Sequence, residues 1–117
     1  MKTVFLFSCI LSIILFFPAC EADHDDHCLH GNGEIVTRDI YVPAFDKVHL
    51  NGTGNVYINQ GNVYHVTVET DRNLVDNLET HVHDGLWEIE FDRCVNDLSV
   101  LNVFITVPHI YEMVING

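Results

Sequence analysis

The chain has 117 residues, with 17 aspartates and glutamates against 5 lysines and arginines, and its formal net charge at pH 7 is −12. A nucleic-acid-binding protein needs a basic surface to displace counterions from phosphates, whereas Arg38, Lys47, Arg72 and Arg93 form no cluster in the sequence. The composition therefore argues against a nucleic-acid partner. The length is sufficient for one domain or for part of one.

Residues 1–19 have the features of a lipoprotein signal peptide. Met1-Lys2 precedes an apolar run from Val4 to Phe17, which is shorter than a membrane-spanning helix. Phe17-Pro18-Ala19-Cys20 then resembles the lipobox of bacterial lipoproteins, in which a small residue precedes the cysteine that is lipidated. We predict that Cys20 carries the lipid anchor; ordinary cleavage nearby, giving a secreted protein, is the alternative.

Residues 20–33 are predicted to form an acidic, histidine-rich tether. Most of this segment is polar, and Gly31-Asn32-Gly33 supplies flexible backbone. Imidazole and carboxylate groups are suitable zinc or copper ligands, but the spacing of His24, His27 and His30 fits no closed metal motif. These histidines are weak candidates, and we predict no metal and no other cofactor.

Two cysteines remain after Cys9 leaves with the signal peptide and Cys20 is lipidated: Cys28 and Cys94. Because thiols oxidise outside the cytoplasm, we predict a disulfide between them, with two free thiols as the alternative. Closing this loop would destabilise the unfolded chain by about 4 kcal/mol in the chain-entropy model.

The rest of the chain, residues 34–117, reads as a β domain. Short β-branched and aromatic runs alternate with turn residues, and the expected strands cover residues 35–42, 47–50, 55–59, 64–69, 80–83, 86–92 and 101–107. Asp84-Gly85 is typical of a tight hairpin turn. Trp87 alternates with polar residues and is expected in the core. Residues 71–78 predict either a short helix, with Asp71 as its cap, or a loop.

An internal repeat indicates how the strands are arranged. Residues 40–52 recur as residues 105–117, with apolar residues at the same spacing, as in a recurring β unit. The first copy continues through Thr53-Gly54 into a strand, whereas the sequence stops after the second copy. We predict an all-β domain interrupted in mid-repeat, for which a solenoid and an antiparallel β-sandwich are both compatible with the pattern.

Several side chains could carry chemistry. Glu88 and Glu90 lie on one strand face, and paired carboxylates can hydrolyse glycosides, although regular alternation is the expected pattern of any exposed sheet face. His81 and His83 share a face but lack an identified third metal ligand. Exposed tyrosines could stack on sugar rings; the candidates are Tyr57, Tyr64 and Tyr111.

The ordered motifs resemble those of the head GIN domain family. The segments that carry the resemblance are Gly31-Asn32-Gly33, Pro43-Ala44-Phe45-Asp46-Lys47-Val48, residues 51–61, Asp84-Gly85-Leu86-Trp87, Ile105-Thr106-Val107-Pro108 and Ile115-Asn116-Gly117. The resemblance covers about residues 31–117. It implies a right-handed parallel β-helix-like domain of a lipoprotein from a Bacteroidetes-type bacterium, with a proposed adhesive role, no assigned catalytic residues and a length that makes this chain the N-terminal part.

The prediction is thus a non-enzymatic cell-envelope lipoprotein that acts as an adhesin or binding module. Its expected partners are a membrane, through the lipid anchor, and a glycan or protein ligand. Its expected location is the bacterial outer membrane, on the periplasmic or the cell-surface face. The alternatives are a polysaccharide-acting enzyme and a structural or envelope-stress module without a diffusible ligand.

Overall fold

The structure, a computed structural model, describes residues 27–116, and these residues form strands and one 3₁₀ turn, η1 (Val75–Asn77). The all-β class is therefore confirmed. The strands are β1 (Leu29–His30), β2 (Ile35–Ile40), β3 (Lys47–Asn51), β4 (Asn55–Gln60), β5 (His65–Asp71), β6 (Val82–His83), β7 (Leu86–Ile89), β8 (Val95–Asn96), β9 (Leu101–Val107) and β10 (Glu112–Asn116).

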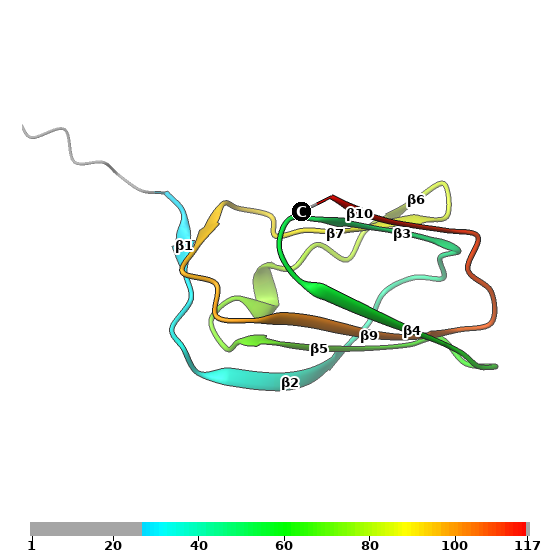
Figure 1. The fold of residues 1–117 in the computed structure, drawn as a ribbon, viewed down its shortest axis with the longest axis horizontal. Helices are drawn as coiled ribbons and strands as arrows, with labels where there is room; N and C mark the ends of the chain where they lie inside the picture. The colour runs from blue at the N-terminus through cyan, green and yellow to red at the C-terminus, as the bar shows by residue number, and fades with distance from the viewer. Residues whose placement is uncertain (1–26, 117) are drawn as a thin grey trace, which may run out of the picture.

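The strands form two four-stranded sheets and a small third one (Figure 1). One layer has the order β10-β3-β7-β6, the other has the order β2-β5-β9-β4, and β1 pairs with β8 at one end of the molecule. Both large sheets are mixed. Pairing is parallel for β3 with β7 and β10, and for β4 with β9, but antiparallel for β2 with β5, β5 with β9, and β6 with β7.

The internal repeat corresponds to real structural equivalence. Strand β10 lies parallel to β3 in the register that places Met113 beside Val48 and Ile115 beside Leu50. These are the residues that the repeat aligns, so the two copies occupy equivalent positions in one sheet. The chain crosses between the layers after β3, and it crosses in the other direction after β9 (Figure 1).

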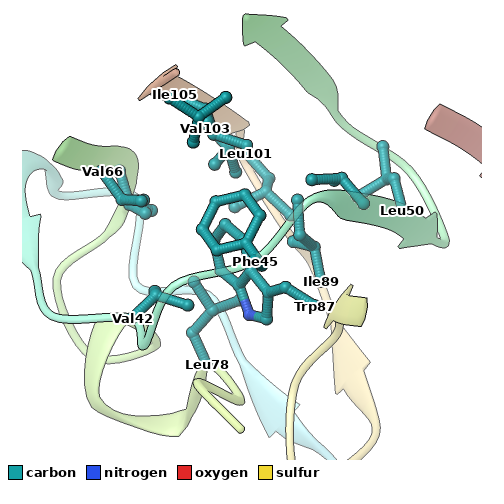
Figure 2. Close-up of a cluster of buried hydrophobic side chains, with 13 residues drawn as sticks. Val42, Phe45, Leu50, Val66, Leu78, Trp87, Ile89, Leu101, Val103 and Ile105 are labelled. Atoms are coloured by element: carbon teal, nitrogen blue, oxygen red, sulfur yellow. The ribbon is translucent and has the colours of Figure 1, made fainter. Parts of the chain in front are cut away.

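The core lies between the two large sheets, as the alternating pattern predicts. Side chains from β3 and β7 meet side chains from β5 and β9 in one cluster (Figure 2). Trp87 is fully buried, its ring centroid lies 5.3 Å from that of Phe45, and its indole nitrogen donates a hydrogen bond to the carbonyl oxygen of Glu79 at 2.9 Å. The prediction that Trp87 is a core residue is confirmed.

Two local predictions have clear outcomes. Asp84 and Gly85 have φ angles of 51° and 77°, so both adopt the left-handed region that a tight hairpin between β6 and β7 requires. For residues 71–78, where the sequence predicted a short helix or a loop, the structure has only the 3₁₀ turn η1, because Asp71 continues strand β5 and Leu78 forms a β-bridge with Phe91. Residues 27–116 contain no helix with the length and hydrophobicity needed to cross a bilayer.

Candidate functional site

A hollow of about 610 Å³ lies where the β3–β4 turn faces the loop after β7. We call it the turn cleft. Its lining residues are Asn51, Thr53, Glu90, Phe91, Asp92, Arg93, Cys94, Val95 and Leu98. A second hollow of about 230 Å³ shares Thr53 and Leu98 with it and extends along the start of β4 and β9.

The backbone explains why the turn cleft is open. Gly52 has a φ of 118°, a value that favours glycine, and its amide donates to the carbonyl oxygen of Asn116 at 2.8 Å. This holds one wall in the register of the sheet. The other wall leaves the sheet after Ile89, because residues 95–96 pair with β1 rather than with either large sheet.

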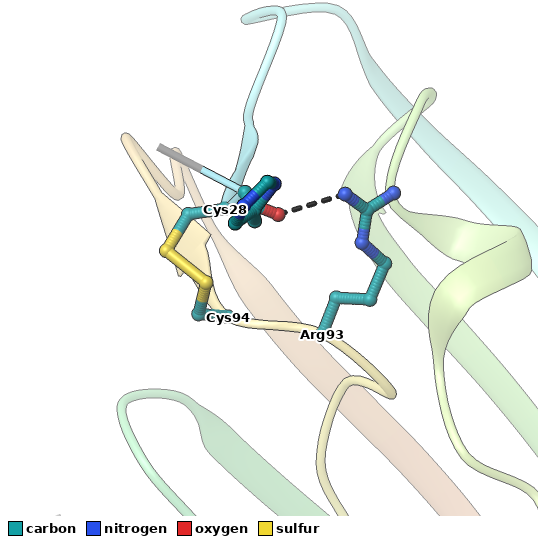
Figure 3. The surroundings of a disulfide bond; sticks show 4 residues. Cys28, Arg93 and Cys94 are labelled. Carbon is teal, nitrogen blue, oxygen red and sulfur yellow. Dashed lines mark hydrogen bonds between the residues drawn. A yellow bond between two sulfur atoms is a disulfide. The ribbon is translucent and has the colours of Figure 1, made fainter. Parts of the chain in front are cut away.

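The polar groups of the turn cleft are oriented by hydrogen bonds. Asn51 Nδ2 donates to Glu90 Oε2 at 3.4 Å, and Asn77 Nδ2 donates to Asp92 Oδ1 at 3.1 Å. Arg93 donates from Nη2 to the carbonyl oxygen of His27 at 2.7 Å (Figure 3). The cleft therefore combines fixed carboxylate and amide groups with the apolar ring of Phe91, which suits binding of a polar ligand.

The wall at Cys94 is covalently fixed. Cys94 forms a disulfide with Cys28, across a sequence separation of 66 residues (Figure 3). The predicted pairing is therefore confirmed. The amide of Leu29 also donates to the carbonyl oxygen of Cys94 at 2.7 Å, so the segment before β2 is joined to the cleft loop on both sides of the disulfide.

Asp71, at the end of β5, is a fully buried carboxylate that connects three segments. Its Oδ1 accepts from the amide of Ser99 at 2.9 Å, and its Oδ2 accepts from the Ser99 hydroxyl at 2.7 Å and from the amide of Gly33 at 2.8 Å. Burial raises the pKa of Asp71, but these hydrogen bonds outweigh that effect and hold the pKa below its ordinary value of 3.8.

Further contacts hold residues 28–34 against the rest of the β domain. This range includes most of the predicted tether that the structure describes. Asn73 donates to the carbonyl oxygen of His30 at 2.6 Å, and Arg72 pairs with Glu34 at 3.0 Å. We call residues 28–34 the clasp, together with their partners Asp71, Arg72, Asn73, Cys94 and Ser99. The sequence predicted its disulfide, but not its hydrogen bonds, because their partners are distant in sequence.

The histidine candidates are not brought together. His24 and the lipidation candidate Cys20 lie outside the described residues, whereas His30 Nδ1 lies 2.9 Å from Asp97 Oδ2. Within residues 27–116, no group of three or more histidine, cysteine, aspartate or glutamate side chains could hold a metal ion. His81 and His83 pair with different carboxylates, those of Glu79 and Asp84.

The candidate carboxylates have different surroundings. Glu88 is exposed on β7, whereas Glu90 is half-buried and contacts Asn51 in the turn cleft. Both also line a smaller hollow of about 190 Å³ with Glu79, His81, His83 and Leu86. Among the tyrosines, Tyr57 is exposed but stacks on Phe104, with ring centroids 5.0 Å apart, while Tyr64 and Tyr111 are exposed elsewhere.

Sequence reasoning identified Glu90 but missed its neighbours in the turn cleft. Thr53 lies between two expected strands and Asp92 ends the expected strand 86–92, and no pattern in the sequence connects the two. The signal that was available is the length of chain between the strand at Trp87 and the strand at Leu101, since a connection that long often forms one wall of a binding site.

Comparison with known proteins identifies the family. The model of the family described as "putative auto-transporter adhesin, head GIN domain" matches residues 44–117, which is more than half of the chain. Among curated proteins, none matches.

Several solved structures have a similar fold. A "putative adhesin" of Parabacteroides merdae has 20% identity and a TM-score of 0.69, with 76% of this chain matching 38% of that one. A "putative adhesin" of Bacteroides fragilis has 22% identity, a TM-score of 0.64, and coverages of 76% and 43%. A "putative lipid binding protein" of Parabacteroides distasonis has 21% identity, a TM-score of 0.62, and coverages of 76% and 40%.

At such identities the likeness shows a shared fold, and this chain spans about two fifths of the length of each of these proteins. The family match confirms the resemblance that the sequence motifs indicated. The chain belongs to the head GIN domain family.

Proposed function

We propose that this protein is an exported, lipid-anchored lipoprotein of the cell envelope, and that its β domain is a non-enzymatic, adhesin-like binding module. Family membership supports an adhesive role. The apolar run before Cys20 and the small residue at Ala19 support export and lipidation. The outer membrane, on its periplasmic or surface face, is the proposed location.

The observation that carries the binding proposal is the turn cleft. Side chains from two segments that are far apart in the sequence, residues 51–53 and 90–98, converge on it, and hydrogen bonds hold several of their polar groups in place. A ligand that docks in a prearranged site loses less conformational freedom, so more of the interaction energy appears as affinity. The disulfide at Cys94 contributes directly to this prearrangement.

The clasp is suited to transmit mechanical force between the anchor segment and the β domain. If lipid is attached at Cys20, a pull on the bound domain passes along the chain to Cys28, where the disulfide transfers it to Cys94 beside the cleft. The force therefore bypasses the hydrogen bonds between β2 and β5. Such an arrangement suits a protein that holds a surface at a distance from a membrane.

The proposed architecture is the N-terminal part of a right-handed β-helix. Its support is the parallel pairing of β3 with β10 and of β4 with β9, in which successive crossings between the layers stack in register. A strand that followed a turn after β10 would lie beside β4, in the position that continues this stack.

Lipidation is tested by metabolic labelling with palmitate. We expect label in the native protein, loss of label in Cys20→Ser, and retained label in the matched control Cys9→Ser, because Cys9 lies within the predicted signal peptide. Label that persists in Cys20→Ser would overturn the anchor.

Adhesion is tested by displaying the full chain on bacteria and measuring attachment to surfaces coated with mucin, fibronectin or collagen. Thr53→Trp fills the turn cleft and should abolish attachment, whereas Thr37→Trp, on the exposed face of β2, should leave it unchanged. No attachment to any surface, or attachment that Thr53→Trp leaves intact, would contradict the proposal. Release of sugar from mucin that Glu88→Gln or Glu90→Gln abolishes would favour the enzyme alternative.

A further inference from the structure

We propose that the turn cleft binds a neutral oligosaccharide, an inference that rests on the proposed binding function and specifies its ligand class. The first argument is size. A hollow of about 610 Å³ falls within the usual range for small-molecule sites, roughly 300–1,000 Å³. The adjoining hollow of about 230 Å³ extends it in one direction, so the site suits a chain of sugar rings better than a single ring.

The second argument is the kind of polar group that the cleft presents. Asn51 offers an amide, Thr53 a hydroxyl, and Glu90 and Asp92 offer carboxylates. A sugar hydroxyl is both donor and acceptor, and a carboxylate accepts strongly from adjacent hydroxyls on one ring. The hydrogen bonds from Asn51 to Glu90 and from Asn77 to Asp92 aim these acceptors before any ligand arrives.

The third argument is the apolar part of the lining. Phe91, Val95 and Leu98 lie among the polar residues of the cleft and are half-buried. A sugar ring has one or two faces of C–H groups, and aromatic side chains with large apolar surfaces are suitable partners for them. A ligand that is polar at its edges and apolar on its faces matches this mixture.

The fourth argument is charge, and it separates neutral from acidic saccharides. Two carboxylates, those of Glu90 and Asp92, line the cleft with one cation, Arg93, whose guanidinium donates to the carbonyl oxygen of His27. The chain as a whole carries a formal charge of −12. Uronic acids, sulfated glycans and phosphate groups would be repelled by both the site and the surrounding field.

The test is an NMR titration of the full-length ¹⁵N-labelled chain with cellohexaose, xylohexaose, mannohexaose and maltohexaose as neutral probes. Hexagalacturonate and a chondroitin sulfate hexasaccharide serve as acidic probes. We expect at least one neutral probe to shift the amides of residues 51–54 and 90–98, and neither acidic probe to do so. Asn51→Ala with Glu90→Gln should weaken that binding about tenfold or more, since both variants remove hydrogen bonds to the ligand.

The matched control is Glu88→Gln, which changes the same residue type two positions earlier in the chain, on β7 and outside the turn cleft, and should leave the affinity within about twofold. Unchanged amide shifts in β5 and β9 confirm that each variant is folded. Preference for an acidic probe, or neutral binding that shifts amides elsewhere, overturns the proposal.

The outcomes also separate the two proposals. If no hexasaccharide binds but attachment to fibronectin or collagen still depends on Thr53, the ligand class is wrong and the binding function stands. If neither hexasaccharide binding nor attachment depends on the turn cleft, both proposals fail.

Discussion

Two regions of this β domain, the clasp and the edge formed by β4 and β10, are held by different kinds of contact. At the clasp, a polar segment is joined to the body by a disulfide, a buried carboxylate and several hydrogen bonds. At a second region, which we call the open edge, β4 and β10 each have one neighbour among the described strands. Met113 and Ile115 of β10 are 41% and 54% exposed, although their register partners Val48 and Leu50 are 0% and 1% exposed.

The comparison shows that the position of a repeat copy in the sheet, and not its residue types, decides how much it contributes to the free energy of unfolding. Both copies present apolar side chains to the interior side of their sheet, but only β3 has a strand of the other layer against it. Free energy of unfolding is therefore concentrated around β3, β5, β7 and β9, on which Val56 and Ile58 of β4 also pack, and β10 adds little. An uncovered apolar edge is also a surface on which another strand can pair.

The largest expected effect comes from truncating a covered copy of the repeat. Leu50→Ala should lower the free energy of unfolding by about 2–5 kcal/mol, because it leaves a cavity between the sheets. The equivalent change at the open edge, Ile115→Ala, should cost below about 1 kcal/mol. Urea unfolding measures both values, and equal losses would contradict the comparison.

The next effect tests the clasp. Replacing Cys28 and Cys94 with serine should lower the free energy of unfolding by about 2–4 kcal/mol, because the unfolded chain gains the freedom of the opened loop. Thermal unfolding under non-reducing conditions gives the result. A variant with both serines that melts with the native protein would show that the disulfide does not stabilise the clasp.

Asp71→Asn should lower the free energy of unfolding by a smaller amount, about 1–3 kcal/mol. The new amide group presents a donor where the Ser99 and Gly33 amides also donate, so at least one buried hydrogen bond is lost. Asp76→Asn is the control, because Asp76 is exposed and makes a single long contact, 3.3 Å, with Arg38. It should change the free energy of unfolding by less than about 0.5 kcal/mol.

Asp71 also predicts a dependence on pH. Its pKa is lower in the folded than in the unfolded chain, so its contribution is complete above the unfolded pKa, near 3.8, and is lost as pH falls through the folded pKa. The stability gap between the native protein and Asp71→Asn should thus be constant from pH 7 to about 5 and narrow below 3.8. Urea midpoints at several pH values would show this; a gap that widens in acid has the wrong sign.

The features that could be predicted from the sequence are those that depend on neighbouring residues or on the cellular compartment. Alternation identified Trp87 as a core residue, Asp84-Gly85 identified the hairpin, and the compartment suggested the disulfide. The sequence could not predict the role of Asp71, which looked like a helix cap, because the donors come from Gly33 and Ser99, both far away along the chain. The turn cleft was missed for the same reason, since it arises where a turn and a long loop face each other in space.

Hydrogen–deuterium exchange of the full chain at low protein concentration compares both regions in one measurement. The account predicts slow exchange in β3, β5 and β9 and at the clasp amides of Leu29 and Gly33, which have backbone or carboxylate acceptors, with fast exchange in β10. If β10 is protected as strongly as β3, or if the clasp exchanges as fast as β10, the central comparison is wrong.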